Sequence, residues 1–214
     1  MSTRFVPAVA AAFASVGDLL MLYVAAVPRG DGADVFQAWM LLAGHYLGVL
    51  AIPVYALGYW QVSAAITRAP LARTVRLLGA AASALGATIH GITGVVIGVA
   101  RSSDVHAHGA GAVAPFTGIP GADLLASYAE FLLPLWVMVT VLMIAVSVAS
   151  AAAAASGASR HPRWAAVFNP AALVVYIALL GTPLPAGPFV VAAAPNLAHL
   201  VFFALTAALD RGRE

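Results

Sequence analysis

Carboxyl and imidazole side chains lie inside long apolar segments of this chain, where both are rare. Asp18 and Glu130 are the two acidic residues in that setting, and His45, His90 and His199 share it. A strongly polar group in hydrocarbon is costly and usually marks a functional site. A carboxyl removed from water can keep its proton at neutral pH and donate it, and an imidazole can accept a proton. The sequence therefore predicts acid–base chemistry in apolar surroundings.

The composition indicates that these surroundings are a membrane. The chain is 63% hydrophobic and 8% charged, and its mean hydropathy is +0.97, which is unlike a water-soluble domain. We expect an all-α, polytopic integral membrane protein: one domain over residues 1–214, a bundle of six transmembrane helices with the first segment retained. A helix of about 20 residues crosses the hydrocarbon core, and the apolar segments lie near residues 5–27, 38–64, 75–100, 122–155, 164–183 and 187–209.

The arginines predict the orientation of this bundle. If the N-terminus is cytoplasmic, eight of the ten arginines fall on the cytoplasmic side, and only Arg29 and Arg101 fall outside. Cytoplasmic loops of membrane proteins carry such an excess. We therefore expect an N-in/C-in, multi-pass protein of the bacterial inner (plasma) membrane. The net charge of +2 reflects orientation and does not indicate nucleic acid.

Two missing residue types exclude several chemistries. The chain contains no cysteine and no lysine. Without cysteine there are no disulfides, thiolate nucleophiles or iron–sulfur clusters. Without lysine there is no Schiff base to retinal or pyridoxal phosphate, and no Walker-type phosphate loop.

Counting residues from the expected outer helix ends, at ~1.5 Å per residue, places the buried polar groups at one depth. This layer lies in the outer half of the membrane and takes residues from five helices. Two histidines adjoin glycine pairs of the small-xxx-small type, 44/48 and 94/98, which allow helices to approach closely. The layer predicts a pocket that opens toward the outer leaflet, formed by Asp18, His45, His90, Glu130, Asn196 and His199.

Prolines and aromatic residues add to this pocket. Pro53, Pro134 and Pro195 lie within expected helices, and each leaves free the carbonyl four residues earlier. Kinked helices at membrane depth are tolerated where they line a cavity. The expected substrate-binding residues are Asn196, Tyr128, Trp136 and Tyr46. We expect the other aromatic residues, Tyr55 and Tyr59 among them, to be interface anchors or packing.

Three connections are also informative. The stretch from Ser102 to Gly121 is expected to form a long outer loop of the kind that can act as a lid. It contains His106 and His108, a weak metal-binding pattern. The pair Asn169-Pro170 predicts a kink or restart of the fifth helix, and residues 181–188, with three prolines, predict a stiff hairpin.

Several short segments are typical of a known family: Gly17-Asp18-Leu19-Leu20, Gly44-His45-Tyr46-Leu47-Gly48, Gly58-Tyr59-Trp60, Ile89-His90-Gly91, Phe168-Asn169-Pro170 and Asn196-Leu197-Ala198-His199-Leu200. Over most of its length the chain resembles a bacterial family of small six-helix membrane proteins with no assigned activity. By the type of site alone it is similar to membrane-embedded terpene (isoprenoid) cyclases and sterol isomerases. The resemblance implies a helical bundle and brings no substrate.

Four functions fit these observations. The first is an intramembrane enzyme without cofactor or bound metal that isomerises or cyclises a lipid or lipophilic small molecule by acid–base chemistry. In it, Glu130 and Asp18 act as acid and base, tuned by His45, His90 and His199. The second is a protein that binds a divalent metal or haem through those three histidines. The third is a proton-coupled transporter, and the fourth is a structural membrane protein. The oligomeric state stays open.

Overall fold

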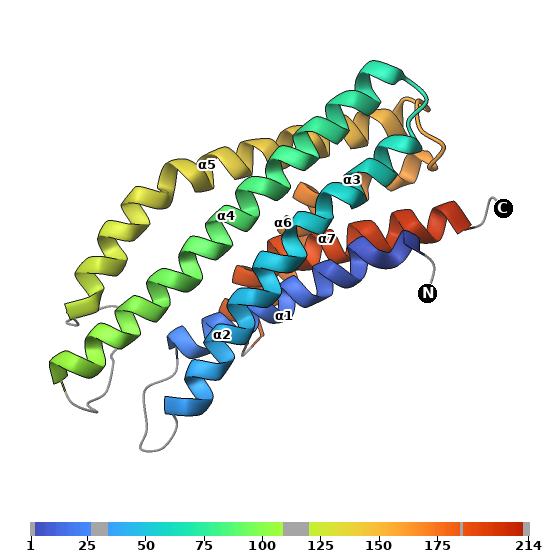
Figure 1. Cartoon of the computed structure of the whole chain (residues 1–214). Coiled ribbons are helices and arrows are strands. Elements are labelled where there is room, and N and C mark those ends of the chain that lie inside the picture. Colours follow the sequence, from blue (N-terminus) through green and yellow to red (C-terminus); the bar gives the residue numbers. More distant parts are fainter. Residues whose placement is uncertain (1–2, 27–33, 109–119, 185, 212–214) are drawn as a thin grey trace.

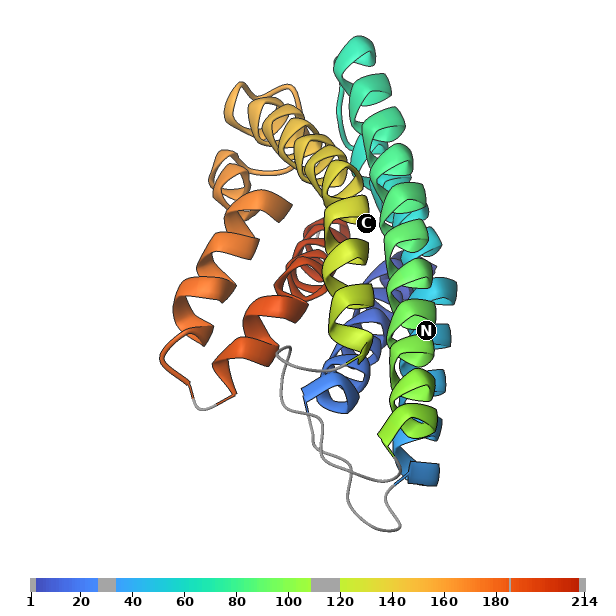
Figure 2. The ribbon, with the colours of Figure 1, turned by 90° about the vertical axis from the view of Figure 1, so that its left-hand side faces the viewer.

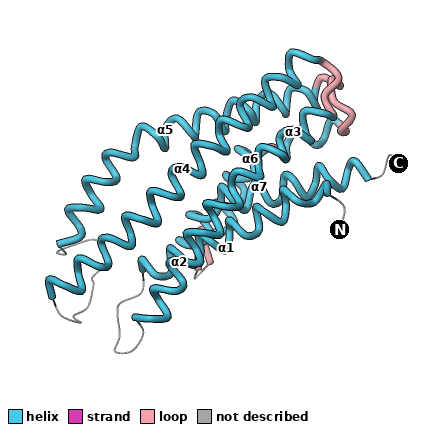
Figure 3. Tube along the Cα trace, in the orientation of Figure 1, coloured by secondary structure: helices cyan, strands magenta, loops and turns pink. Residues whose placement is uncertain are grey.

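The computed structural model describes residues 3–26, 34–108, 120–184 and 186–211. Its regular elements are helices throughout, apart from a single β-bridge between Ile66 and Ser159. The prediction of an all-α chain is therefore confirmed (Figures 1 and 3). The α helices are α1 (Val6–Ala26), α2 (Asp34–Ala51), α3 (Tyr55–Ala64), α4 (Ala69–His108), α5 (Pro120–Ala155), α6 (Pro170–Gly181) and α7 (Gly187–Arg211), with short 3-10 helices η1 (Thr3–Phe5), η2 (Ile52–Val54) and η3 (Arg163–Phe168).

Among the residues that the structure describes, five helical segments are long and apolar enough to cross a membrane, which indicates a multi-pass membrane protein. The sixth expected span is α6, which has 12 residues and reaches only about 18 Å. The count of six spans therefore stays a prediction. Large apolar side chains cover the outside of the bundle, and Phe131 and Leu180 are 84% and 74% exposed. The five segments are Thr3–Val24, Gln37–Ala64, Ala69–Val99, Glu130–Ala155 and Phe189–Asp210.

The start of α1 and the end of α7 lie at the same end of the bundle (Figure 1). The connections α3–α4 and α5–η3 meet at this end, because the Thr67 amide donates to the Ala158 carbonyl at 2.9 Å and the Arg160 amide to the Ala65 carbonyl at 2.8 Å. We call it the arginine end, since Arg4, Arg68, Arg160 and Arg163 belong to these segments. The arginine end therefore holds part of the excess of arginines from which the N-in/C-in orientation is predicted.

The expected continuous helix over residues 38–64 is broken. It consists of α2 and α3, joined by the 3-10 turn Ile52–Val54. The physical reason is Pro53, which has no amide hydrogen and cannot continue the α-helical hydrogen-bond pattern. The break makes Tyr55 the first residue of α3.

The expected helix over residues 164–183 is also two pieces, η3 and α6. The side chain of Asn169 caps α6 by accepting from the Ala172 amide at 3.1 Å, and Pro170 occupies the first turn. Both are favoured positions at a helix start. The predicted restart at Asn169-Pro170 is confirmed.

The expected outer loop from Ser102 to Gly121 is wrong at both ends. Helix α4 continues to His108, and α5 already begins at Pro120. Residues 102–108 contain neither glycine nor proline, so nothing stops the helix there, while proline suits the first turn of α5. The middle of the predicted loop and the side chains of His106 and His108 lie outside what the structure describes.

All seven α helices contribute to a core rich in alanine, which includes Ala11 and Ala14 of α1, Ala153 of α5 and Ala198 of α7. Small residues let transmembrane helices approach closely. Figure 2 shows α5 beside α4, whereas α6 lies beside α7 on the other side of the bundle. The elements that carry the polar residues are therefore tightly packed, and α5 and α6 border them.

Candidate functional site

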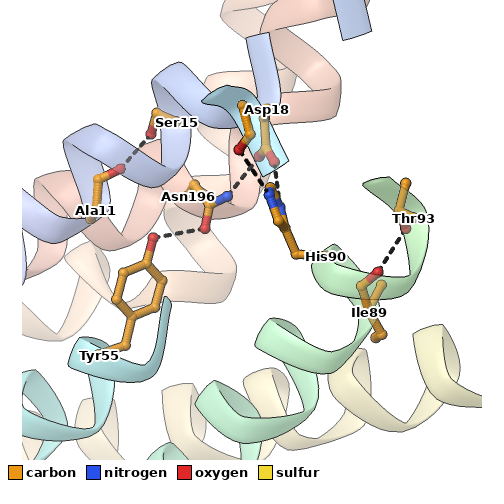
Figure 4. Close-up of polar contacts among 9 residues, drawn as sticks. Ala11, Ser15, Asp18, Tyr55, Ile89, His90, Thr93 and Asn196 are labelled. Atoms are coloured by element: carbon orange, nitrogen blue, oxygen red, sulfur yellow. Dashed lines mark hydrogen bonds and ion pairs between the residues drawn. The ribbon is translucent and has the colours of Figure 1, made fainter. Parts of the chain in front are cut away.

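Four polar side chains from four helices form a chain of hydrogen bonds inside the bundle (Figure 4). The Tyr55 hydroxyl donates to Asn196 Oδ1 at 2.7 Å. Asn196 Nδ2 donates to Asp18 Oδ2 at 2.6 Å, and Asp18 Oδ1 lies 3.2 Å from His90 Nδ1. Tyr55, Asn196 and His90 are buried, and Asp18 is nearly so. We call these four residues the polar cluster.

The position of one proton in the polar cluster follows from its geometry. His90 Nε2 lies 3.3 Å from the Gly44 carbonyl oxygen, and because a carbonyl only accepts, Nε2 carries a hydrogen and donates. The close approach of Nδ1 to Asp18 Oδ1 then requires one further proton between these two atoms. Whether that proton is on His90 or on Asp18, the pair has no net charge.

A second hydrogen-bonded pair adjoins the cluster. His199 Nδ1 lies 2.7 Å from the Pro195 carbonyl, so Nδ1 carries the hydrogen and Nε2 accepts from the Tyr59 hydroxyl at 2.8 Å. This arrangement fits a neutral imidazole. The His199 ring stacks on the Tyr55 ring with centroids 4.7 Å apart, so it supports the tyrosine that holds Asn196.

Glycines make room for two of the imidazoles, those of His45 and His90. A β-carbon at Gly48 would overlap the His90 ring, and one at Gly94 would overlap the His45 ring. The His90 ring of α4 therefore packs on Gly48 of α2, and the His45 ring of α2 packs on Gly94 of α4. The two rings stack with centroids 6.5 Å apart. The small-xxx-small patterns predicted this close contact. His45 Nδ1 is buried without a hydrogen-bond partner among the described residues.

A cavity of about 490 Å³ borders the polar cluster. All four cluster residues and His199 line it, and the rest of its wall is mainly apolar, including Met21, Ile89, Met143 and Val174. This volume falls within the range of about 300–1,000 Å³ that is typical of small-molecule pockets. The polar cluster is therefore part of the wall of a mainly apolar cavity.

The structure brings Asp18, His90, Asn196 and His199 together, with His45 behind His90. Trp136 also lines the cavity. The Glu130 side chain is exposed on α5 and is not among the cavity-lining residues. Tyr46 is 53% exposed and lies in a surface groove between α1 and α2, and the side chain of Tyr128 lies outside the described part of the chain.

The sequence did not predict Tyr55 and Tyr59 as site residues, because both were expected to be interface anchors or packing. Both are buried and hydrogen-bonded to site residues. Their spacing of four residues directly after Pro53 puts both on one face of a new helix, and that spacing was the available signal.

The histidines offer few lone pairs to a metal. Both ring nitrogens of His90 and of His199 are engaged in hydrogen bonds or an ion pair. Within the described residues, no group of three or more His, Asp or Glu side chains is arranged to hold a metal ion.

These features define a class: a helical membrane protein in which a buried Asp–His pair and its hydrogen-bonding partners face an apolar cavity. The chain belongs to a family of unknown function, DUF6796, whose model matches residues 4–209. No curated protein and no solved structure matches it. The membership agrees with the resemblance to an uncharacterised family and gives no support for a likeness to terpene cyclases.

Proposed function

We propose that this protein is an intramembrane enzyme that isomerises or cyclises a lipophilic substrate by acid–base chemistry. The observation that carries the proposal is the Asp18–His90 pair, 3.2 Å apart, in the wall of the apolar cavity. A carboxyl and an imidazole that share one proton form an acid and a base in a single unit.

The proton count suits this class of reaction. Asp18 donates its proton to a substrate double bond or epoxide, and a carbocation forms. The carboxylate, assisted by His90, then removes a proton from a neighbouring carbon, so the enzyme returns to its starting state. Isomerisation and cyclisation conserve protons, so no redox partner is needed. The faces of Tyr55 and Trp136, which line the cavity, can stabilise the cation.

Asn196 and Tyr55 act as positioning residues in this mechanism. The Asn196 amide fixes one carboxyl oxygen of Asp18, and Tyr55 fixes the amide. A carboxyl held in this way keeps one orientation toward the cavity, which favours proton transfer to a bound substrate.

The proposed location is the bacterial plasma membrane, with the arginine end in the cytoplasm. The support is the gathering of arginines at the end where α1 begins and α7 ends, since cytoplasmic segments carry such an excess.

The proposal can be tested with membranes that contain the protein, incubated with a bacterial lipid extract in D₂O. The wild type should place deuterium on carbon in particular lipids, detected by mass spectrometry, and Asp18→Asn should not. Asp210→Asn is the matched control, because Asp210 also pairs with a histidine, His161, at 3.3 Å, but does not line the cavity. Equal deuterium incorporation by Asp18→Asn and the wild type would refute the proposal.

A further inference from the structure

The lining of the cavity specifies the charge of its ligand. The Asp18–His90 pair has no net charge wherever its proton lies, and the hydrogen bonds of His199 fit a neutral imidazole. The other polar side chains that line the cavity are neutral amide, hydroxyl and indole groups: Asn196, Tyr55, Ser83, Thr93, Thr140 and Trp136. None of the described lining residues is an arginine, and the chain contains no lysine. A phosphate or carboxylate in this cavity would be a buried charge without a partner, which is strongly unfavourable.

The exposed parts of the lining show where the cavity reaches the surface. Four lining residues are exposed: Trp136 and Thr140 on α5, and Val191 and Ala192 on α7. The lining residues contributed by α1, α3 and α4 are buried or half-buried. The mouth of the cavity therefore lies between α5 and α7.

This mouth lies at the depth of the membrane. Its residues belong to the apolar segments Glu130–Ala155 and Phe189–Asp210. Leu133 and Val137, next to it on α5, are 61% and 54% exposed. Apolar surface on both sides of an opening in a membrane-spanning segment faces lipid, so the opening admits molecules from the bilayer.

From these observations we infer that the ligand is an uncharged lipid, an apolar chain with one hydrogen-bonding group such as an alcohol or a ketone, that enters from the bilayer between α5 and α7. This inference rests on the proposed function, because it assigns the substrate class of the same site. The hydrogen-bonding group meets the polar cluster, and the chain occupies the apolar remainder of the cavity.

The charge argument is tested with two probes that share one chain. Geranylgeraniol and geranylgeranyl phosphate are titrated into the full-length protein in lipid nanodiscs, and binding is measured by native mass spectrometry. The alcohol should bind about a hundredfold more tightly or better, because the phosphate would be a buried charge without a partner. Equal or tighter binding of the phosphate overturns the inference, and so does the absence of binding by either probe.

The entry route is tested by closing the mouth after the protein has folded. The chain has no cysteine, so Ala192→Cys introduces a unique thiol that a bulky, membrane-permeant maleimide can modify. Modification should abolish binding of geranylgeraniol relative to the same variant before modification. Ala152→Cys is the matched control, because Ala152 is an exposed alanine of α5 that does not line the cavity.

These outcomes separate the two proposals. Unchanged binding after modification at Ala192 overturns the route, whatever the deuterium experiment shows. Selective binding of the alcohol together with equal deuterium incorporation by wild type and Asp18→Asn supports the ligand class and refutes the acid–base function.

Discussion

The shared proton of the polar cluster makes a sharp prediction about Asp18→Asn. Asparagine can offer its oxygen to the Asn196 amide and its NH₂ group to His90 Nδ1, while His90 keeps its Nε2 hydrogen on the Gly44 carbonyl. All three hydrogen bonds of the wild type are then retained with a neutral imidazole. The free energy of unfolding should therefore change by less than about 1 kcal/mol.

Asp18→Leu has a similar size but no polar atoms, and it serves as the contrast. It leaves Asn196 Nδ2 and His90 Nδ1 without partners, and a buried unpaired group costs about 1–3 kcal/mol. The two together predict a loss of about 2–6 kcal/mol, toward the lower end because hydrogen bonds in membranes are often weak.

Both variants can be compared by reversible unfolding in mixed detergent and SDS micelles, followed by circular dichroism. If Asp18→Asn is as unstable as Asp18→Leu, the carboxylate charge itself stabilises the bundle and the neutral, proton-sharing description of the cluster is refuted. A stable Asp18→Leu would show that the hydrogen bonds contribute nothing to the fold. If Asp18→Asn is stable and Asp18→Leu is not, Asp18→Asn is a suitable variant for the deuterium experiment, since it removes the acidic proton and keeps the structure.

Two further predictions concern the partners of this pair. Tyr55→Phe keeps the ring but leaves the buried Asn196 Oδ1 without its donor, so it should lower the free energy of unfolding by about 1–3 kcal/mol, measured in the same micelles. Gly48→Ala places a methyl group on the His90 ring and should cost about 1–3 kcal/mol. Gly98→Ala is its control on α4, because the nearest atom to the added carbon is 3.8 Å away and alanine favours the helix by about 1 kcal/mol. Equal effects of the two glycine substitutions would contradict the assigned close contact.

The sequence predicted the helices well because the signal is strong and local. Long apolar segments form helices in a membrane, since every backbone group must be hydrogen-bonded within the segment. The ends of the helices depended on single residues. Pro53 broke one helix, and Asn169 capped another. The sequence predicted a kink or restart at Asn169-Pro170 and a free carbonyl before Pro53, but it kept residues 38–64 as one helix, because a proline in a transmembrane segment can kink a helix or interrupt it.

The site was predicted only in part, because depth can be counted from the sequence but helix rotation cannot. Asp18, His90 and Asn196 were placed at one depth and do meet. Glu130 was placed at the same depth, yet its side chain is exposed on α5. A rotation of about 100° per residue separates neighbouring positions on a helix, so a shared layer does not ensure a shared cavity.

The polar cluster and the mouth of the cavity lie on elements that differ in how deeply they are buried. In α1 and α7, 44% of the residues in the most apolar stretch are buried, against 17% in α5. Asp18 and Asn196 lie on the two more deeply buried helices, whereas Trp136 and Thr140, at the mouth, lie on α5. The hydrogen bonds that hold the shared proton are therefore enclosed by protein, whereas the mouth lies on a helix whose apolar side chains are largely free to face the bilayer.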